Sequence, residues 1–143
     1  MIPEIIIKYK TGKEDKVTIT TSLAAYQLFK QMYDSDTIEF TESSIMILLN
    51  RANKSIGWYK ISQGGITGTV IDIRVVLGVA LKSGATGIIL SHNHPSGNLN
   101  PSEADKTLTR KLSDACTICD INLIDHLIVT DDTYYSFKDE GLL

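Results

Sequence analysis

Two of the three histidines in the chain, His92 and His94, are separated by a single residue. They follow residues 87–90 (Gly-Ile-Ile-Leu), which have the composition of a buried strand. Because residues i and i+2 of a strand point to the same face, both imidazoles can converge on one point. Imidazole nitrogens bind zinc and other divalent metals, so the pair is a candidate for metal ligation. A His-x-His pair is a weak signal by itself, because such pairs also occur on solvated strands.

The segment after this strand supplies a candidate third ligand. Residues 95–97 (Pro-Ser-Gly) turn the chain, and a helix is predicted from Pro101 to Cys119 with Asn100 as its N-cap. Ser102 and Asp105 lie three residues apart in its first turn, and therefore on one face. The connecting loop is short enough for the Asp105 carboxylate to return to the imidazoles. Two histidines, one carboxylate and an open position are typical of a catalytic zinc site, which lowers the pKa of its bound water to about 7.

Helix capping is an alternative explanation for Ser102 and Asp105, because the helix dipole alone favours an acidic residue in the first turn. We favour metal ligation for Asp105 because it follows the His-x-His pair and two turn-forming prolines.

Hydrolysis at such a site also requires a base that accepts the proton of the attacking water. Glu42 is the best candidate, because it directly precedes an apolar run, residues 44–49, that is predicted to be an inner strand of the sheet. Glu39 competes with it, although an extended chain would point Glu39 to the opposite face. Both acids are also compatible with an ordinary exposed position before a strand.

The combined spacing of these residues resembles a known motif. His92-x-His94, seven residues, Ser102, two residues and Asp105, with Glu42 upstream, is similar to the JAMM motif of the JAB/MPN metalloproteases. Three flanking runs narrow the resemblance to the RadC branch of that superfamily: residues 91–97 (SHNHPSG), Pro101-Ser102-x-x-Asp105, and residues 125–129 (DHLIV). The resemblance extends from about Ser22 to the C-terminus.

The resemblance implies a cytidine-deaminase-like, three-layer α/β/α fold that holds one Zn²⁺ per chain. His92, His94 and Asp105 match the metal ligands, Glu42 the acid/base glutamate, and Ser102 the serine that stabilises the oxyanion. Longer relatives carry an N-terminal helix-hairpin-helix segment associated with DNA, in place of which this chain has residues 4–20. Deubiquitinating relatives carry insertions that grip ubiquitin, and this compact chain has none, so a ubiquitin-chain substrate is not expected.

The apolar periodicity independently predicts an α/β fold with a mixed sheet. Strands are expected over residues 44–49, 55–62, 86–94, 122–130 and 133–137. Helices are expected over residues 22–33 with Ser22 as cap, from Asp72 as cap to before Gly84, and over residues 101–119. Residues 4–9 and 16–20 are β-rich and predict a hairpin. We therefore expect a single domain over residues 1–143, with a hairpin extension over 1–21 and the family core over 22–143.

The overall composition excludes several classes of protein. Fourteen Lys and Arg against seventeen Asp and Glu give a net charge of −3, which argues against a dedicated binder of the nucleic-acid backbone. The longest apolar runs fall well short of the ~20 residues of a membrane span. The N-terminus lacks the pattern of a signal peptide. We expect a cytoplasmic protein without a membrane partner.

The remaining residues with chemical potential are Cys116, Cys119 and His126. The two cysteines could form a redox or zinc motif, but they lie in a predicted helix without a second C-x-x-C, so small buried apolar residues are the favoured interpretation. His126 follows Asp125 on an apolar strand and could be an additional ligand or part of a dyad. A core histidine, or one that supports a metal ligand, is the favoured interpretation.

The sequence thus predicts a zinc-dependent hydrolase that cleaves a peptide or isopeptide bond, with a peptide or protein as substrate. The alternatives are a binding module of DNA repair or mobile elements with a vestigial or structural zinc, and an enzyme that acts on a small amide or modified amino acid. The glycine-rich loop from Gly64 to Gly68 is a candidate wall of the substrate groove.

Overall fold

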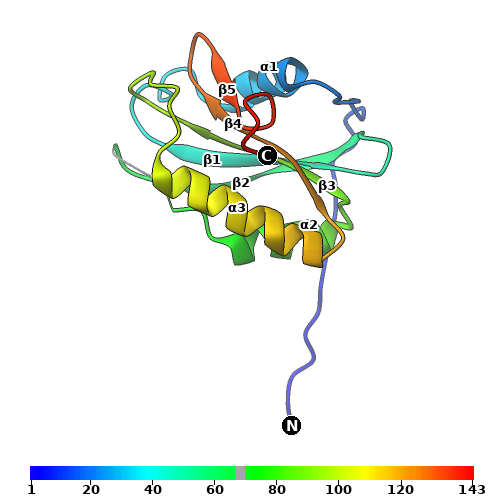
Figure 1. Cartoon of the computed structure of the whole chain (residues 1–143). Helices are drawn as coiled ribbons and strands as arrows, with labels where there is room; N and C mark the ends of the chain where they lie inside the picture. Colours follow the sequence, from blue (N-terminus) through cyan, green and yellow to red (C-terminus); the bar gives the residue numbers. More distant parts are fainter. Residues whose placement is uncertain (67–69) are drawn as a thin grey trace.

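The structure is a computed structural model that describes residues 1–66 and 70–143. The elements follow in the order α1 (Ser22–Met32), β1 (Ser43–Leu49), β2 (Ser55–Gln63), α2 (Ile73–Ser83), β3 (Gly87–Asn93), α3 (Glu103–Ile118), β4 (Asn122–Val129) and β5 (Tyr134–Ser136). The strands form one sheet in the order β2-β1-β3-β4-β5 (Figure 1). β3 and β4 are parallel, and the other neighbours are antiparallel. The predicted α/β fold with a mixed sheet is therefore confirmed.

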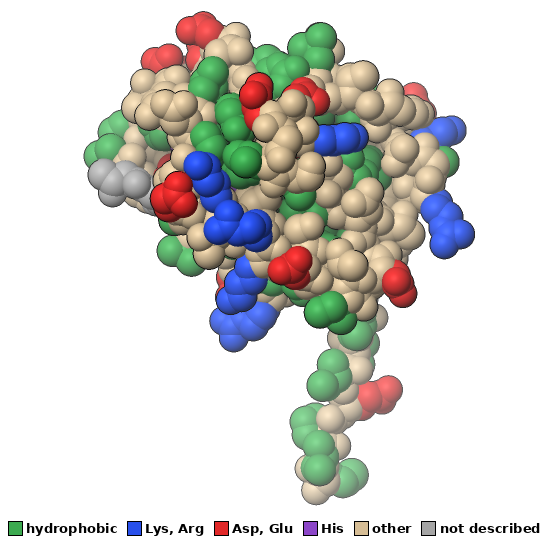
Figure 2. All heavy atoms as spheres, viewed as in Figure 1, with side chains coloured by type: hydrophobic (Ala, Val, Ile, Leu, Met, Phe, Trp, Pro, Cys, Tyr) green, Lys and Arg blue, Asp and Glu red, His purple; other side chains and the backbone are tan. Residues whose placement is uncertain are grey.

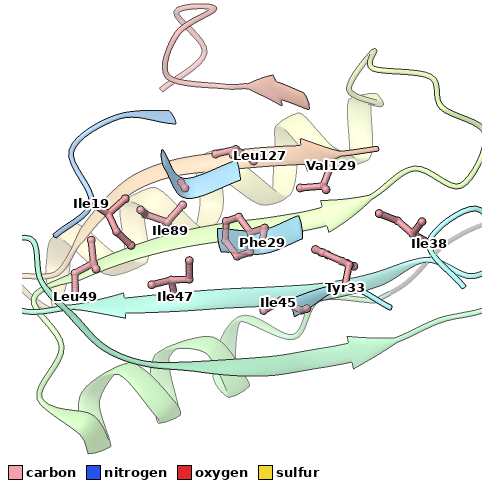
Figure 3. Packing of buried hydrophobic residues seen from close by; sticks show 11 residues of the cluster. Ile19, Phe29, Tyr33, Ile38, Ile45, Ile47, Leu49, Ile89, Leu127 and Val129 are labelled. Atoms are coloured by element: carbon pink, nitrogen blue, oxygen red, sulfur yellow. The ribbon is translucent and has the colours of Figure 1, made fainter. Parts of the chain in front are cut away.

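Helices cover both faces of the sheet, so the expected three layers are also confirmed (Figure 1). Because side chains alternate along a strand, Ile47 of β1 packs toward Phe29 of α1 (Figure 3), whereas Met46 joins Val76 of α2 and Leu112 of α3 on the other face. Every residue of the central strands β1 and β3 is buried. These two strands therefore provide a rigid base for polar residues at their ends.

The ends of the first two helices follow their local sequence. α2 begins after Asp72, whose side chain accepts the Arg74 N–H, and it ends at Gly84, which adopts a left-handed conformation with φ 69°. Both boundaries were predicted, and glycine adopts this φ without the steric cost that a Cβ brings. The cap of α1 is Thr21, one residue before the predicted Ser22.

The predicted cap of α3 is wrong. Asn100 lies in the preceding turn, where its N–H donates to Asn98 Oδ1 at 3.0 Å. The helix begins at Glu103 and is capped by Ser102, whose Oγ accepts the Asp105 N–H at 3.0 Å, while Asp105 Oδ2 accepts the Ser102 N–H at 2.9 Å. This reciprocal capping box satisfies two backbone donors, which a cap at Asn100 would leave unsatisfied.

The N-terminal hairpin predicted for residues 4–20 is also wrong. Residues 1–10 form no strand, and the N-terminal end of the chain projects from the body of the molecule, with exposed isoleucines along this segment (Figures 1 and 2). The backbone of Val17 and Ile19 instead forms hydrogen bonds near the start of β2. The N–H of Ser55, the first residue of β2, donates to Val17 O at 2.8 Å, and the Ile19 N–H donates to Asn53 O in the preceding turn at 2.9 Å. An isolated two-stranded hairpin is only marginally stable in water unless it packs on a further surface. The strand propensity of these residues was therefore not enough to form one.

The two cysteines have different environments. Cys116 is fully buried in the core between α3 and the sheet, and burial raises the pKa of its thiol to about 11. Cys119 is half-buried at the C-terminal end of α3. The interpretation as a packing residue is thus confirmed for Cys116. Within residues 1–66 and 70–143, no helix is both long enough and apolar enough to cross a membrane.

Candidate metal centre

The predicted site residues meet at one end of the sheet, where β3 ends, β1 begins and α3 starts. Ser44 of β1 is paired with His92 of β3. Glu42 continues β1 by one residue, because its N–H donates to Gly65 O and its carbonyl accepts the Gly64 N–H. Alternation along the strand then directs Glu42 and His92 to the face that α3 covers. Asp105 reaches the same face from the first turn of α3.

The donor atoms lie within a few ångströms of one another. The Nε2 atoms of His92 and His94 are 2.9 Å apart, and Asp105 Oδ2 lies 3.4 Å from each of them. Glu42 Oε1 lies 3.9 Å from His92 Nε2 and 4.0 Å from His94 Nε2. The side chains are 2%, 16%, 19% and 13% exposed for His92, His94, Asp105 and Glu42 respectively. The cluster is therefore largely shielded from bulk water yet reachable from it.

The orientation of His94 is fixed by a backbone carbonyl. His94 Nδ1 lies 2.5 Å from Asn98 O in the loop before α3. A carbonyl oxygen only accepts, so Nδ1 carries a proton, and Nε2 is the ring nitrogen that faces the cluster and can ligate a cation.

His92 is held by a chain of hydrogen bonds whose direction is also determined. Thr109 Oγ1 donates to Asp105 O at 2.7 Å, so this hydroxyl must accept from His126 Nδ1, which is 2.7 Å away. A neutral His126 then accepts at Nε2 from His92 Nδ1, at 2.7 Å. The nitrogen of His92 that faces the cluster is consequently Nε2, the atom available to ligate a cation. His126 is thus a core histidine, as one favoured interpretation predicted, and it contacts His92; support of a metal ligand stays a prediction.

The electrostatic environment agrees with these assignments. Burial lowers the pKa of His126 well below its usual value, and the neighbouring His92 lowers it further, so the ring stays neutral. Burial acts to raise the pKa of Asp105, but hydrogen bonds to His92 and His94 outweigh it and hold that pKa far below its usual range. Burial acts to lower the pKa of His94, and contacts with Asp105 and Asn98 O raise it overall. The site thus combines an ionised carboxylate with two ring nitrogens 2.9 Å apart, an arrangement that favours positive charge among these atoms.

This donor set fits a divalent metal ion. Glu42, His92 and His94 offer ligand atoms that all lie within 4.8 Å of one another, and two imidazoles with a carboxylate suit zinc. Asp105 is closer to both rings than Glu42 is, and its Oδ2 is also oriented by the Ser102 N–H. The division of roles, with Asp105 as ligand and Glu42 as base, stays a prediction.

The remaining predicted residues lie as follows. Ser102 is exposed at the start of α3, and its capping contact places it beside Asp105. Capping and a place at the site, which the sequence offered as alternatives, thus coincide in Ser102 and Asp105. Glu39 is exposed in the turn before β1 and makes no ion pair with the histidines. The backbones of Gly64 and Gly65 form hydrogen bonds with the backbone of Glu42, whereas Gly68 lies outside the described residues.

Sequence reasoning did not single out Thr109 or Asn98. Thr109 had a detectable signal, because it lies four residues after Asp105 and therefore on the same face of α3. Asn98 had none, because it acts through its backbone carbonyl.

Replacement of Thr109 by valine is expected to lower the affinity for Zn²⁺ by about 10- to 100-fold, the usual cost of removing a group that orients a metal ligand. Valine preserves the shape and deletes the hydroxyl that fixes the His126 tautomer. Thr109→Ser is the matched control and should retain the affinity of the unaltered chain. A chelator-competition titration measures both, and equal affinities for all three proteins would contradict the orienting role.

Comparison with known proteins adds to this geometry. A family model described as RadC-like JAB domain matches residues 19–142. A UPF0758 protein of Flavobacterium johnsoniae is 53% identical over 97 residues, which cover 68% of this chain and 42% of that protein. A UPF0758 protein of Aquifex aeolicus is 33% identical over 140 residues, 98% of this chain and 58% of that protein. The chain thus spans about half the length of these two curated relatives. The UPF0758 protein YfjY of Escherichia coli is 39% identical over 132 residues, 92% of this chain and 80% of that protein.

Proposed function

This chain belongs to the RadC-like JAB domain family, and from that membership and the site geometry we propose that it is a zinc-dependent hydrolase of peptide or isopeptide bonds. One observation carries the proposal: two carboxylates, Asp105 and Glu42, lie near the same pair of ring nitrogens. A site with three protein ligands needs only one of them. The second carboxylate is therefore available for proton transfer.

The residues of the chain have distinct roles in this reaction. Zinc held by His92, His94 and Asp105 would polarise the substrate carbonyl and lower the pKa of a bound water to about 7. Glu42 accepts the proton of the attacking water and transfers it to the departing amine. The Ser102 oxygen already accepts the Asp105 N–H, and among the described residues none accepts the proton of this hydroxyl. Ser102 can therefore donate it to the oxyanion.

Metal analysis combined with a peptide-cleavage screen tests the proposal. The purified chain should contain close to one zinc per chain, cleave members of a library of linear and isopeptide-linked peptides, and lose this activity with a chelator. Restored activity on zinc addition would support the metal requirement. A zinc-loaded chain that cleaves no library member, or cleavage that persists without metal, would contradict the proposal.

Replacement of Ser102 by alanine is expected to lower turnover by ~100- to 1000-fold, as removal of an oxyanion donor does, with the metal retained. The same change removes the cap of α3 and costs ~1 kcal/mol of stability. Thr21→Ala is the matched control, because it removes the cap of α1 at a helix that supplies no predicted site residue. Steady-state kinetics and thermal unfolding separate the two effects, and equal turnover in both variants would remove Ser102 from the reaction.

A second candidate function, binding of nucleic acid, has one observation in its favour. Lys and Arg side chains gather over α3 and α2 on the face seen in Figure 2, and α3 contributes Lys106, Arg110 and Lys111. The net charge of −3 opposes it. A gel-shift titration at several salt concentrations distinguishes the two functions, because backbone binding weakens steeply with salt.

A further inference from the structure

Asn93, the residue between His92 and His94, is fully buried at the end of β3. Its neighbours on both sides point toward the metal centre, so alternation directs Asn93 to the opposite face of the sheet, which α1 covers. On this face Asn93 follows Ile89 and the buried Ser91. Burial of the Asn93 amide requires hydrogen-bond partners for both the oxygen and the nitrogen.

All partners of this amide lie in the segment that leads into β1. Asn93 Oδ1 accepts the Ser43 N–H at 2.7 Å, and Nδ2 donates to Ile38 O at 2.7 Å and to Thr41 O at 2.9 Å. The orientation of the amide is determined, because a flipped amide would place its NH₂ against the Ser43 N–H and its oxygen against two carbonyls. Ile38 lies near the end of β3 in Figure 3, as these contacts require.

Two of these partners are the residues on either side of Glu42. The backbone of Glu42 itself is paired with Gly64 and Gly65 on the β2 side. The Thr41 carbonyl and the Ser43 N–H, which face the other way, are both held by the Asn93 side chain. Residues 35–40 form a turn, and Thr41 and Glu42 lie between this turn and β1. The contacts of Asn93 and the pairing with Gly64 and Gly65 therefore together determine where Glu42 lies.

We propose that Asn93 is a positioning residue that holds Glu42 at a fixed distance from His92 and His94. Residues 92–94 thus carry the two imidazole rings toward one face of the sheet and, toward the other face, the amide that holds the segment around Glu42. Asparagine is required because its short side chain accepts from the Ser43 N–H and hydroxyl and donates to two carbonyls. Aspartate retains the acceptor but cannot donate when ionised, and serine is too short to span the three partners. This inference rests on the proposed function only for the role of Glu42 as the base. The hydrogen bonds of Asn93 to the segment around Glu42 can be tested without a substrate.

Hydrogen exchange is the first test. In the unaltered chain the Ser43 amide should exchange as slowly as the ladder amides of β1, and exchange at the rate of an exposed turn would overturn the proposal. In Asn93→Ser, amides over residues 38–43 should exchange about 10-fold faster or more. Thr130→Val is the matched control, because Thr130 is buried, caps the β4–β5 turn through Thr133, and contacts none of the site residues. It should leave residues 38–43 unchanged.

Kinetics and metal binding form the second test. Asn93→Ser and the isosteric Asn93→Asp should retain zinc affinity and KM, whereas kcat should fall by about 10- to 100-fold, the cost of displacing a catalytic group by about 1 Å. On a Glu42→Gln background, Asn93→Ser should lower kcat by less than about 2-fold, because both changes act through one carboxylate. Additive losses, or loss of zinc, would overturn the proposal. If the unaltered chain hydrolyses nothing, the proposed function fails, and the exchange result alone decides the role of Asn93.

Discussion

Glu42→Gln is expected to lower the rate of hydrolysis by about 100- to 10,000-fold, the usual contribution of a general acid–base group, and to leave one zinc per chain. Glutamine has the shape of glutamate but cannot accept the proton of the attacking water. Glu42 Oε1 lies about half an ångström farther from the ring nitrogens than Asp105 Oδ2 does, at 3.9 and 4.0 Å against 3.4 Å. The metal should therefore remain bound through Asp105. Single-turnover kinetics and metal analysis of the same preparation measure both outcomes.

Glu39→Gln is the matched control for this experiment. Glu39 lies three residues earlier and has the same charge, but it is exposed in the turn before β1. Its replacement should leave both activity and metal content unchanged. Full activity of Glu42→Gln would remove Glu42 from the reaction. Loss of zinc from that variant would assign Glu42 to the ligand set instead.

His92→Ala is expected to abolish stoichiometric zinc binding. The loss should exceed the ~10- to 100-fold that follows removal of a group that merely orients a ligand. His92 Nε2 is central to the cluster, because His94 and both carboxylates lie within 3.9 Å of it. The change also removes the hydrogen bond that His92 Nδ1 donates to Nε2 of the buried His126. The unsatisfied acceptor lowers the free energy of unfolding by ~1–3 kcal/mol.

A parallel variant separates metal loss from unfolding. His94→Ala removes the second ring at a position that is 16% exposed, so it should lose zinc with less effect on stability. Asn98→Ala is the control, because the backbone carbonyl that orients His94 survives the substitution. Chelator competition and thermal unfolding with and without zinc report on each protein. A folded His92→Ala protein that retains tightly bound zinc would contradict the ligand assignment.

The sequence predicted most of the sheet and the cluster of site residues, because both depend on local patterns. The apolar runs of β1 and β3 gave the inner strands, and the two-residue period of a strand placed His92 and His94 on one face. The short loop to α3 restricted where Asp105 could lie. These inferences required no knowledge of which distant segments meet, whereas the choice of Glu42 rested on the family resemblance.

The two misplaced helix caps are local errors, whereas the other errors and omissions concern interactions between distant segments. Asn93 contacts residues about fifty positions earlier, and His126 meets His92 only through the pairing of β3 with β4. No periodicity encodes such contacts. The false hairpin has the same origin, because strand propensity over residues 4–9 does not reveal whether a neighbouring surface will cover them.

The dispersed origin of the four donor side chains has a thermodynamic consequence. Glu42 comes from the start of β1, the two rings from the end of β3, and Asp105 from α3, so the unfolded chain has no comparable pocket. A cation that recognises this arrangement binds only the native state, and mass action then shifts the folding equilibrium toward that state. At a free concentration a thousandfold above the dissociation constant, this linkage contributes about 4 kcal/mol. The supply of that cation would thereby influence the fraction of the chain that is folded.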